Sequence, residues 1–92
     1  MSINRFNPRT DAVQGPIVRA LEAIGAKVYY IKLPLDLLVG WRNRNVLLEC
    51  KGWKARLTKD QEEFFATWPG EKHLVHSPEE ALTAILGKQA MR

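Results

Sequence analysis

The sequence has little that could cross-link the chain or anchor it in a membrane. It has 92 residues and one cysteine, Cys50, so no intramolecular disulfide can form, and no Cys/His spacing typical of a structural zinc site surrounds it. The most apolar stretch, residues 33–39, is short and contains Asp36, and the N-terminus lacks the apolar segment of a signal peptide. We therefore expect a cytoplasmic protein that neither spans nor enters a membrane.

The chain also lacks internal repeats, linkers and low-complexity segments. A chain this short supports one domain, and 46% apolar residues with three tryptophans are typical of a globular protein. Residues 1–9 are polar and show no periodicity, which indicates either a flexible basic arm that touches a phosphate backbone or a disordered terminus. We assign residues 10–92 to the single domain. The net charge of +4 favours an anionic partner such as nucleic acid but does not identify one.

Three types of signal predict the secondary structure. Apolar residues from Val13 to Ile24 recur at helical spacing and Gly25 supplies the end, although Pro16 implies that the helix starts near Gln14 or is kinked. Runs rich in β-branched, aromatic or other apolar residues predict strands at 27–33, 35–39, 46–50 and 73–76. Capping sequences at Thr58 and Ser77 predict helices that end near Pro69-Gly70 and at Leu86. The order is α-β-β-β-α-β-α, a single small α/β domain.

The polar segment Arg42-Asn43-Arg44-Asn45 separates the second and third predicted strands and indicates an antiparallel hairpin with its arginines at the tip. Asp36 belongs to one of these strands and Glu49 to the other, each among apolar residues where an unpaired carboxylate is costly. Residues two apart share a face of a strand, so Glu49 and Lys51 point the same way. If the strands pair, Asp36 and Glu49 converge.

This constellation fits metal-assisted hydrolysis. Asp36, Glu49 and the backbone carbonyl of Cys50 would supply the hard oxygen ligands that Mg²⁺ or Mn²⁺ prefers. Lys51 would orient or help deprotonate the attacking water and offset charge on the transition state. The plainer alternative is that Glu49 and Lys51 form a solvated ion pair at a strand end and that Asp36 is a turn residue.

The sequence resembles the PD-(D/E)XK phosphodiesterase superfamily, which includes restriction endonucleases and archaeal Holliday-junction resolvases. It looks most like the stand-alone virus-type replication-repair nuclease (VRR-Nuc) modules carried by phages. The residues that carry the resemblance are Arg9, Asp11, Gln14, Asp36, Glu49-Cys50-Lys51, Leu57-Thr58 and Gln61, with the last strand and helix. Pro34 is separated from Asp36 by Leu35, whereas the family commonly has the two residues adjacent.

The resemblance implies a restriction-endonuclease-like mixed sheet flanked by helices, and a homodimer that cuts branched DNA such as Holliday junctions. It assigns Asp36 and Glu49 as metal ligands and Lys51 as the catalytic lysine. Gln61 would be a catalytic-site residue that orients the others, and Asp11 would match an acidic residue that the first helix often contributes. From the sequence alone, Gln61 fits a helix-capping role equally well.

Further residues are candidates for contact with DNA. The basic residues near the proposed site and in the N-terminal arm are Arg9, Arg42, Arg44, Lys54, Arg56 and Lys59. A merely soluble basic surface explains them as well. The aromatic residues near and in the second predicted helix are Trp53, Phe64, Phe65 and Trp68, and their spacing favours core or dimer packing over base stacking. His73 and His76 read as surface residues rather than metal ligands.

The sequence thus predicts a Mg²⁺- or Mn²⁺-dependent endodeoxyribonuclease. The alternative is a catalytically inactive DNA-binding or interaction module with the same fold.

Overall fold

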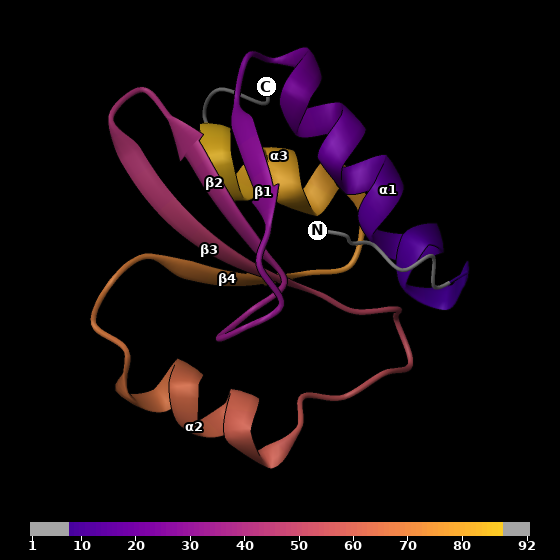
Figure 1. Ribbon diagram of the computed structural model, residues 1–92, viewed down its shortest axis with the longest axis vertical. Helices are drawn as coiled ribbons and strands as arrows, with labels where there is room; N and C mark the ends of the chain where they lie inside the picture. Colours follow the sequence, from indigo (N-terminus) through magenta and orange to yellow (C-terminus); the bar gives the residue numbers. More distant parts are fainter. Residues whose placement is uncertain (1–7, 88–92) are drawn as a thin grey trace.

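The computed structural model describes the backbone of residues 8–87 and the side chains of residues 12–87. Along the chain the elements are α1 (Pro8–Ala23), β1 (Lys27–Tyr30), β2 (Leu37–Trp41), β3 (Arg44–Cys50), α2 (Lys59–Thr67), β4 (Lys72–Val75) and α3 (Pro78–Leu86). This is the predicted α-β-β-β-α-β-α order of a small α/β domain (Figure 1).

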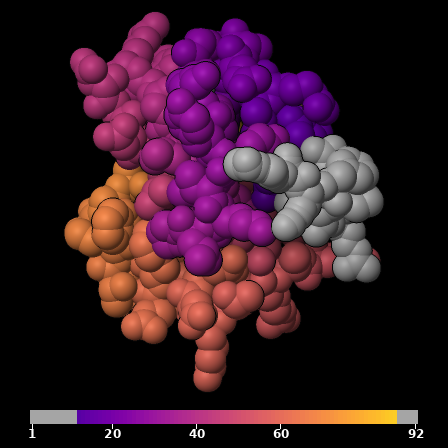
Figure 2. Space-filling model, in the orientation of Figure 1, coloured from indigo at the N-terminus to yellow at the C-terminus, as the bar shows by residue number. Residues whose placement is uncertain are grey.

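The four strands form one mixed sheet in the order β1-β2-β3-β4, with β1, β2 and β3 antiparallel and β4 parallel to β3. Helices α1 and α3 pack against each other and on one face of the sheet, whereas α2 lies on the opposite side (Figure 1). An apolar groove runs between that second face and the end of α2, lined in part by Pro34, Leu38, Leu47 and Trp68. The segment before β2, violet in Figure 2, lies above the salmon and orange surface of α2 in this view.

Alternation along the β2-β3 hairpin explains how the sheet separates these two layers. Leu37 pairs with Leu48 and Val39 with Val46, and all four side chains are fully buried under α1 and α3. The hairpin closes through Arg42 and Asn43, which both have positive φ (49° and 67°). A two-residue turn needs this conformation to match the right-handed twist of the two strands that it joins. The predicted turn of four residues is therefore two residues too long.

The largest difference from the predicted strands is the segment between β1 and β2. The amides of Ile31 and Lys32 both donate to the Asp36 carbonyl, at 2.9 and 3.4 Å, which folds residues 31–36 into a tight turn. Lys32 has a φ of 73°, and the Leu33–Pro34 peptide is cis. The predicted strand end at Leu33 is wrong, as is the predicted start at Leu35. Leu35 is nevertheless fully buried, so the apolar run correctly indicated burial but not conformation.

Helix α1 also starts earlier than expected. It begins at Pro8, where a proline loses no hydrogen bond, and continues through Pro16 to Ala23. A proline at an interior position costs a backbone bond, and burial of Ile17 and Leu21 on the face toward the sheet offsets that cost. The end of the predicted arm, Pro8 and Arg9, thus lies in a helix, and residues 1–7 lie outside the described part of the chain.

No helix in the described part of the chain is long and apolar enough to cross a membrane.

Candidate active site

The β2-β3 register determines where the two predicted carboxylates lie. Because Leu37 is opposite Leu48, the preceding residue, Asp36, is opposite Glu49 at the open end of the hairpin. Asp36 is the last residue of the 31–36 turn rather than a strand residue, and its Oδ2 accepts a 2.9 Å hydrogen bond from the backbone N–H of Cys50. The structure therefore brings Asp36 and Glu49 together at the open end of the hairpin.

Glu49 is the most enclosed polar side chain of this cluster, with 2% of its surface exposed. Its Oε2 lies 3.5 Å from Nζ of Lys51 and accepts a 2.8 Å hydrogen bond from Nε2 of Gln61. Its Oε1 is buried without a hydrogen-bond partner. A buried acceptor of this kind has lost its hydration, and a ligand that provides a positive charge or a donor would offset that cost.

Gln61 forms the capping box and also contacts Glu49, so its geometry fits both of the roles that the sequence left open. Its Oε1 accepts from the Thr58 backbone N–H at 2.9 Å while Oγ1 of Thr58 accepts from the Gln61 N–H at 3.2 Å, which completes a capping box at the start of α2. With the amide oxygen used in this way, the amide nitrogen points at Glu49. Since α2 has no buried residue, this contact ties a peripheral helix to the site.

Burial sets the protonation of the cluster. It raises the pKa of Glu49 to about 7, with a further rise from the charge of Asp36, while the ammonium of Lys51 acts in the opposite direction. The pKa of Asp36 is raised as well, chiefly by burial, although the Cys50 N–H and the Lys51 charge favour its ionised form. Burial and both neighbouring carboxylates raise the pKa of the Cys50 thiol to about 12, which keeps it protonated. A cation in the site would relieve the repulsion between the two carboxylates.

Gln14 is a further member of the cluster, and its position could have been predicted. Its side chain is 7% exposed on α1 and hydrogen-bonds the Asp36 carboxylate, which lowers the pKa of that group. Gln14 lies three, four and seven residues before Ile17, Val18 and Leu21, so it occupies the buried face of the helix. An amide at such a position signals a polar partner below it.

The residues present fit a hard divalent cation. Asp36 and Glu49 provide two adjacent carboxylates, the carbonyl of Cys50 is the third oxygen that the sequence predicts, and the partnerless Oε1 of Glu49 is a free acceptor. Within the described residues no group of three or more His, Cys, Asp or Glu side chains is placed to hold a metal. Two carboxylates and a carbonyl would leave the other coordination positions to water, as Mg²⁺ and Mn²⁺ commonly do. Asp11, the remaining predicted ligand, has a side chain outside the described part.

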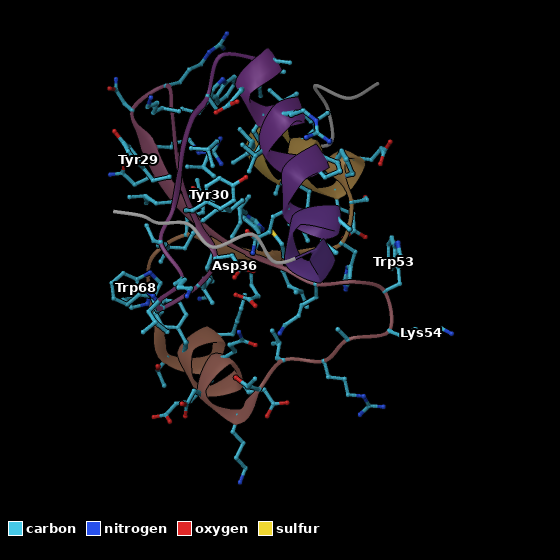
Figure 3. The ribbon with its side chains drawn as sticks, turned by 45° about the vertical axis from the view of Figure 1, so that its right-hand side comes forward. Tyr29, Tyr30, Asp36, Trp53, Lys54 and Trp68 are labelled. Atoms are coloured by element: carbon cyan, nitrogen blue, oxygen red, sulfur yellow. The ribbon has the colours of Figure 1, made fainter. Side chains whose placement is uncertain are left out.

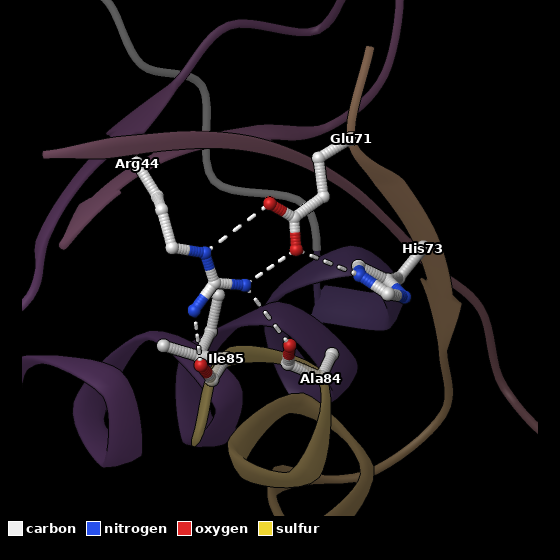
Figure 4. A network of polar contacts seen from close by, with 5 residues as sticks. All are labelled: Arg44, Glu71, His73, Ala84 and Ile85. Carbon is white, nitrogen blue, oxygen red and sulfur yellow. Dashed lines mark hydrogen bonds and ion pairs between the residues drawn. The ribbon is translucent and has the colours of Figure 1, made fainter. Parts of the chain in front are cut away.

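The predicted DNA-binding cations divide into two groups. Arg44 does not project from the hairpin tip as expected (Figure 4). Its guanidinium forms an ion pair with Glu71, which also contacts His73, and donates to the carbonyls of Ala84 and Ile85 at the end of α3. This geometry gives Arg44 a structural role in joining β3 to α3, because a guanidinium is a strong donor for the free carbonyls of a helix end.

The other cations remain available. Arg42 lies over the ring of Trp41 at 4.5 Å from its centroid. Lys54, Arg56 and Lys59 are exposed and form no ion pair with a described residue. The side chain of Arg9 lies outside the described part, so DNA contact by any of these residues stays a prediction.

The aromatic residues were predicted to pack in the core or in a dimer interface, and the first of these alternatives is wrong. None of the four belongs to the hydrophobic core, and packing in a dimer stays a prediction. Phe64 stacks on Trp68 and meets Phe65 edge to face, which forms a small cluster along α2. Trp53 is 67% exposed on the loop after β3.

The two histidines each contact a carboxylate: His73 meets Glu71 and His76 meets Glu80.

No family model matches the chain, and no curated protein or solved structure is significantly similar to it. The resemblance to PD-(D/E)XK nucleases therefore stays a prediction.

Proposed function

We propose that the chain is a Mg²⁺- or Mn²⁺-dependent endonuclease that hydrolyses DNA phosphodiester bonds. The observation that carries the proposal is the buried carboxylate of Glu49, which lies against Asp36, Lys51 and Gln61 and keeps one oxygen without a partner. Paired carboxylates with perturbed pKa values beside a lysine are the groups that phosphodiester hydrolysis needs.

Each residue has a distinct task in this proposal. Asp36 and Glu49, with the Cys50 carbonyl, would hold the cation, which when bound would polarise a phosphate oxygen and lower the pKa of water. Lys51, 3.5 Å from Glu49 and half-buried, would orient the attacking water and offset negative charge that grows on the phosphate. Gln61 fixes the direction of the Glu49 carboxylate through its 2.8 Å bond.

The preference for branched DNA such as Holliday junctions, and the homodimer, rest on the resemblance. A symmetric interface would also cover apolar surface, since Leu33 is 81% and Trp68 43% exposed beside the apolar groove. The rival function is an inactive DNA-binding or interaction module with the same fold. Convergence of Asp36, Lys51 and Gln61 on Glu49, at the cost of burying that carboxylate, favours the enzyme.

The test is to incubate the protein with four-way junction, flap, single-stranded and linear duplex DNA in Mg²⁺, Mn²⁺ or a chelator. We expect cleavage that requires the metal and is fastest on a branched DNA. Asp36→Asn should abolish cleavage and leave DNA binding equal or tighter, because it removes a ligand and a negative charge. Asp60→Asn is the matched control, because Asp60 is exposed in the first turn of α2 and should not alter the rate.

A protein that binds these DNAs but cuts none of them in either metal is the inactive module. Equal loss of binding and cutting in Asp36→Asn, with a lower melting temperature, would mean that Asp36 maintains the fold instead.

A further inference from the structure

The loop that follows the candidate site presents an exposed aromatic ring. Trp53 stacks on the imidazole of His76, with ring centroids 4.5 Å apart and planes inclined by 10°. The indole is nevertheless 67% exposed, so the stack covers one face of the ring and leaves the other toward solvent. Figure 3 shows Trp53 and Lys54 projecting outward from this loop, away from α1 and the sheet.

The ring under Trp53 is held by the first turn of α3. Oε1 of Glu80 accepts a hydrogen bond from the backbone N–H of His76 at 2.8 Å. The same oxygen lies 2.9 Å from Nδ1 of the His76 ring. The Lys51 N–H bond to the Val75 carbonyl anchors the start of the loop on β4, and the Ala55 N–H bond to the Gly52 carbonyl closes a turn around Trp53. An exposed aromatic ring with a fixed support loses little conformational freedom on binding, which is the property of a recognition surface.

The loop that carries the ring begins next to the proposed site. Trp53 is two residues after Lys51, so their Cα atoms are at most about 7 Å apart. That distance corresponds to about two steps of B-form rise along one strand. Lys54 and Arg56 on the same loop are exposed and have no ion pair with a described residue, so cationic groups are available for phosphates on either side of the ring.

We propose that Trp53 is a stacking platform for an unpaired base that flanks the cut phosphate, with Lys54 and Arg56 against the adjoining backbone. The inference rests on the proposed nuclease function and narrows its substrate to DNA with unpaired nucleotides next to the scissile bond. A base within a duplex has both faces covered by its neighbours, whereas an unpaired base can stack on an aromatic side chain. The cations around the ring favour nucleic acid over an apolar protein segment as its partner.

The test measures binding separately from cutting. Fluorescence anisotropy in a chelator would give the affinity of the intact protein for a forked DNA with single-stranded arms and for a blunt duplex of the same base-paired length. We expect Trp53→Ala to weaken fork binding by about 5- to 150-fold, which corresponds to ~1–3 kcal/mol per stacked base, and to change duplex binding by less than about twofold. Trp53→Phe should restore most of the fork affinity.

Two matched controls separate stacking from general effects. Tyr29→Ala removes another exposed ring, 58% exposed on β1, and should leave both affinities unchanged. Lys54→Ala should weaken fork and duplex alike and lower the slope of affinity against salt by about one. Melting curves of each variant verify that the fold is retained.

Equal effects of Trp53→Ala on fork and duplex, no effect on either, or a Trp53→Phe variant as weak as Trp53→Ala would each overturn the stacking proposal. These outcomes leave the cleavage assay unaffected. Conversely, a selective loss of fork binding in a protein that never cuts would support Trp53 as a platform and reject the nuclease.

Discussion

Replacing Glu49 with glutamine should make the metal-free protein more stable at neutral and alkaline pH. The substitution keeps the size and shape of the side chain but removes the charge that burial and Asp36 disfavour. The rise of the Glu49 pKa from its ordinary 4.5 to about 7 corresponds to about 3 kcal/mol of lost stability when the group is ionised. Solvent screens this charge little, because Glu49 is 2% exposed.

The direction follows from proton binding. Between about pH 4.5 and pH 7 the unfolded chain has lost the Glu49 proton while the folded protein still holds it, so the free energy of unfolding falls as pH rises through this window. Above about pH 7 Glu49 is ionised in both the folded and the unfolded state, so this group no longer changes the free energy of unfolding with pH. Asp36, whose pKa is also raised, adds a decrease of the same sign.

Urea unfolding followed by tryptophan fluorescence, from pH 4.5 to 8.5 in a chelator, measures this profile. The wild type should lose stability toward pH 7, whereas Glu49→Gln should show a shallower decline and exceed the wild type at pH 8. Glu63→Gln, at an exposed position on α2, is the control and should follow the wild type. Superimposable profiles for wild type and Glu49→Gln would refute the argument that burial of this carboxylate is costly.

Two further substitutions test the supports of the site. Gln61→Ala should cost about 1 to 2 kcal/mol of stability, because it removes half of the capping box, and it should also slow cleavage, because Glu49 loses its hydrogen bond from the amide. Thr58→Ala removes only the other half of the box, so it should reproduce the loss of stability with a smaller loss of cleavage rate. Arg44→Met should destabilise the protein by about 1 kcal/mol or somewhat more, in chemical unfolding, and leave DNA affinity nearly unchanged, because its guanidinium is already bound within the fold. A large loss of DNA affinity in Arg44→Met would show that this residue contacts DNA after all.

Hydrophobic alternation and capping sequences were sufficient to predict the order of the elements, because each signal is local. Convergence of Asp36 and Glu49 also followed from the sequence, since a short hairpin fixes its own register and hence the facing pairs. The 31–36 turn did not follow, because its conformation depends on two amides that meet the Asp36 carbonyl, a contact that apolar composition does not encode.

Contacts between residues far apart in the chain could not be predicted from the sequence either. Arg44 reaches Glu71 and the end of α3, 27 to 41 residues away, and composition around the hairpin suggested only an exposed basic tip. Trp53 was assigned to packing because of the spacing of the aromatic residues around the second predicted helix, although it lies on the loop before α2 and stacks on His76. Gln14, by contrast, could have been found, since an amide on an apolar helical face is a signal that the sequence already contains.

Single-turnover cleavage by the wild type and Lys51→Met at saturating Mn²⁺ tests most directly whether Lys51 acts in metal-dependent cleavage of DNA. Methionine keeps much of the aliphatic stem and deletes the ammonium that lies 3.5 Å from Glu49. If the lysine positions water or offsets transition-state charge, the rate should fall by about 10²-fold or more while melting curves show the fold intact. Cleavage by Lys51→Met at the wild-type rate, or a wild type that does not cut at all, would contradict the account.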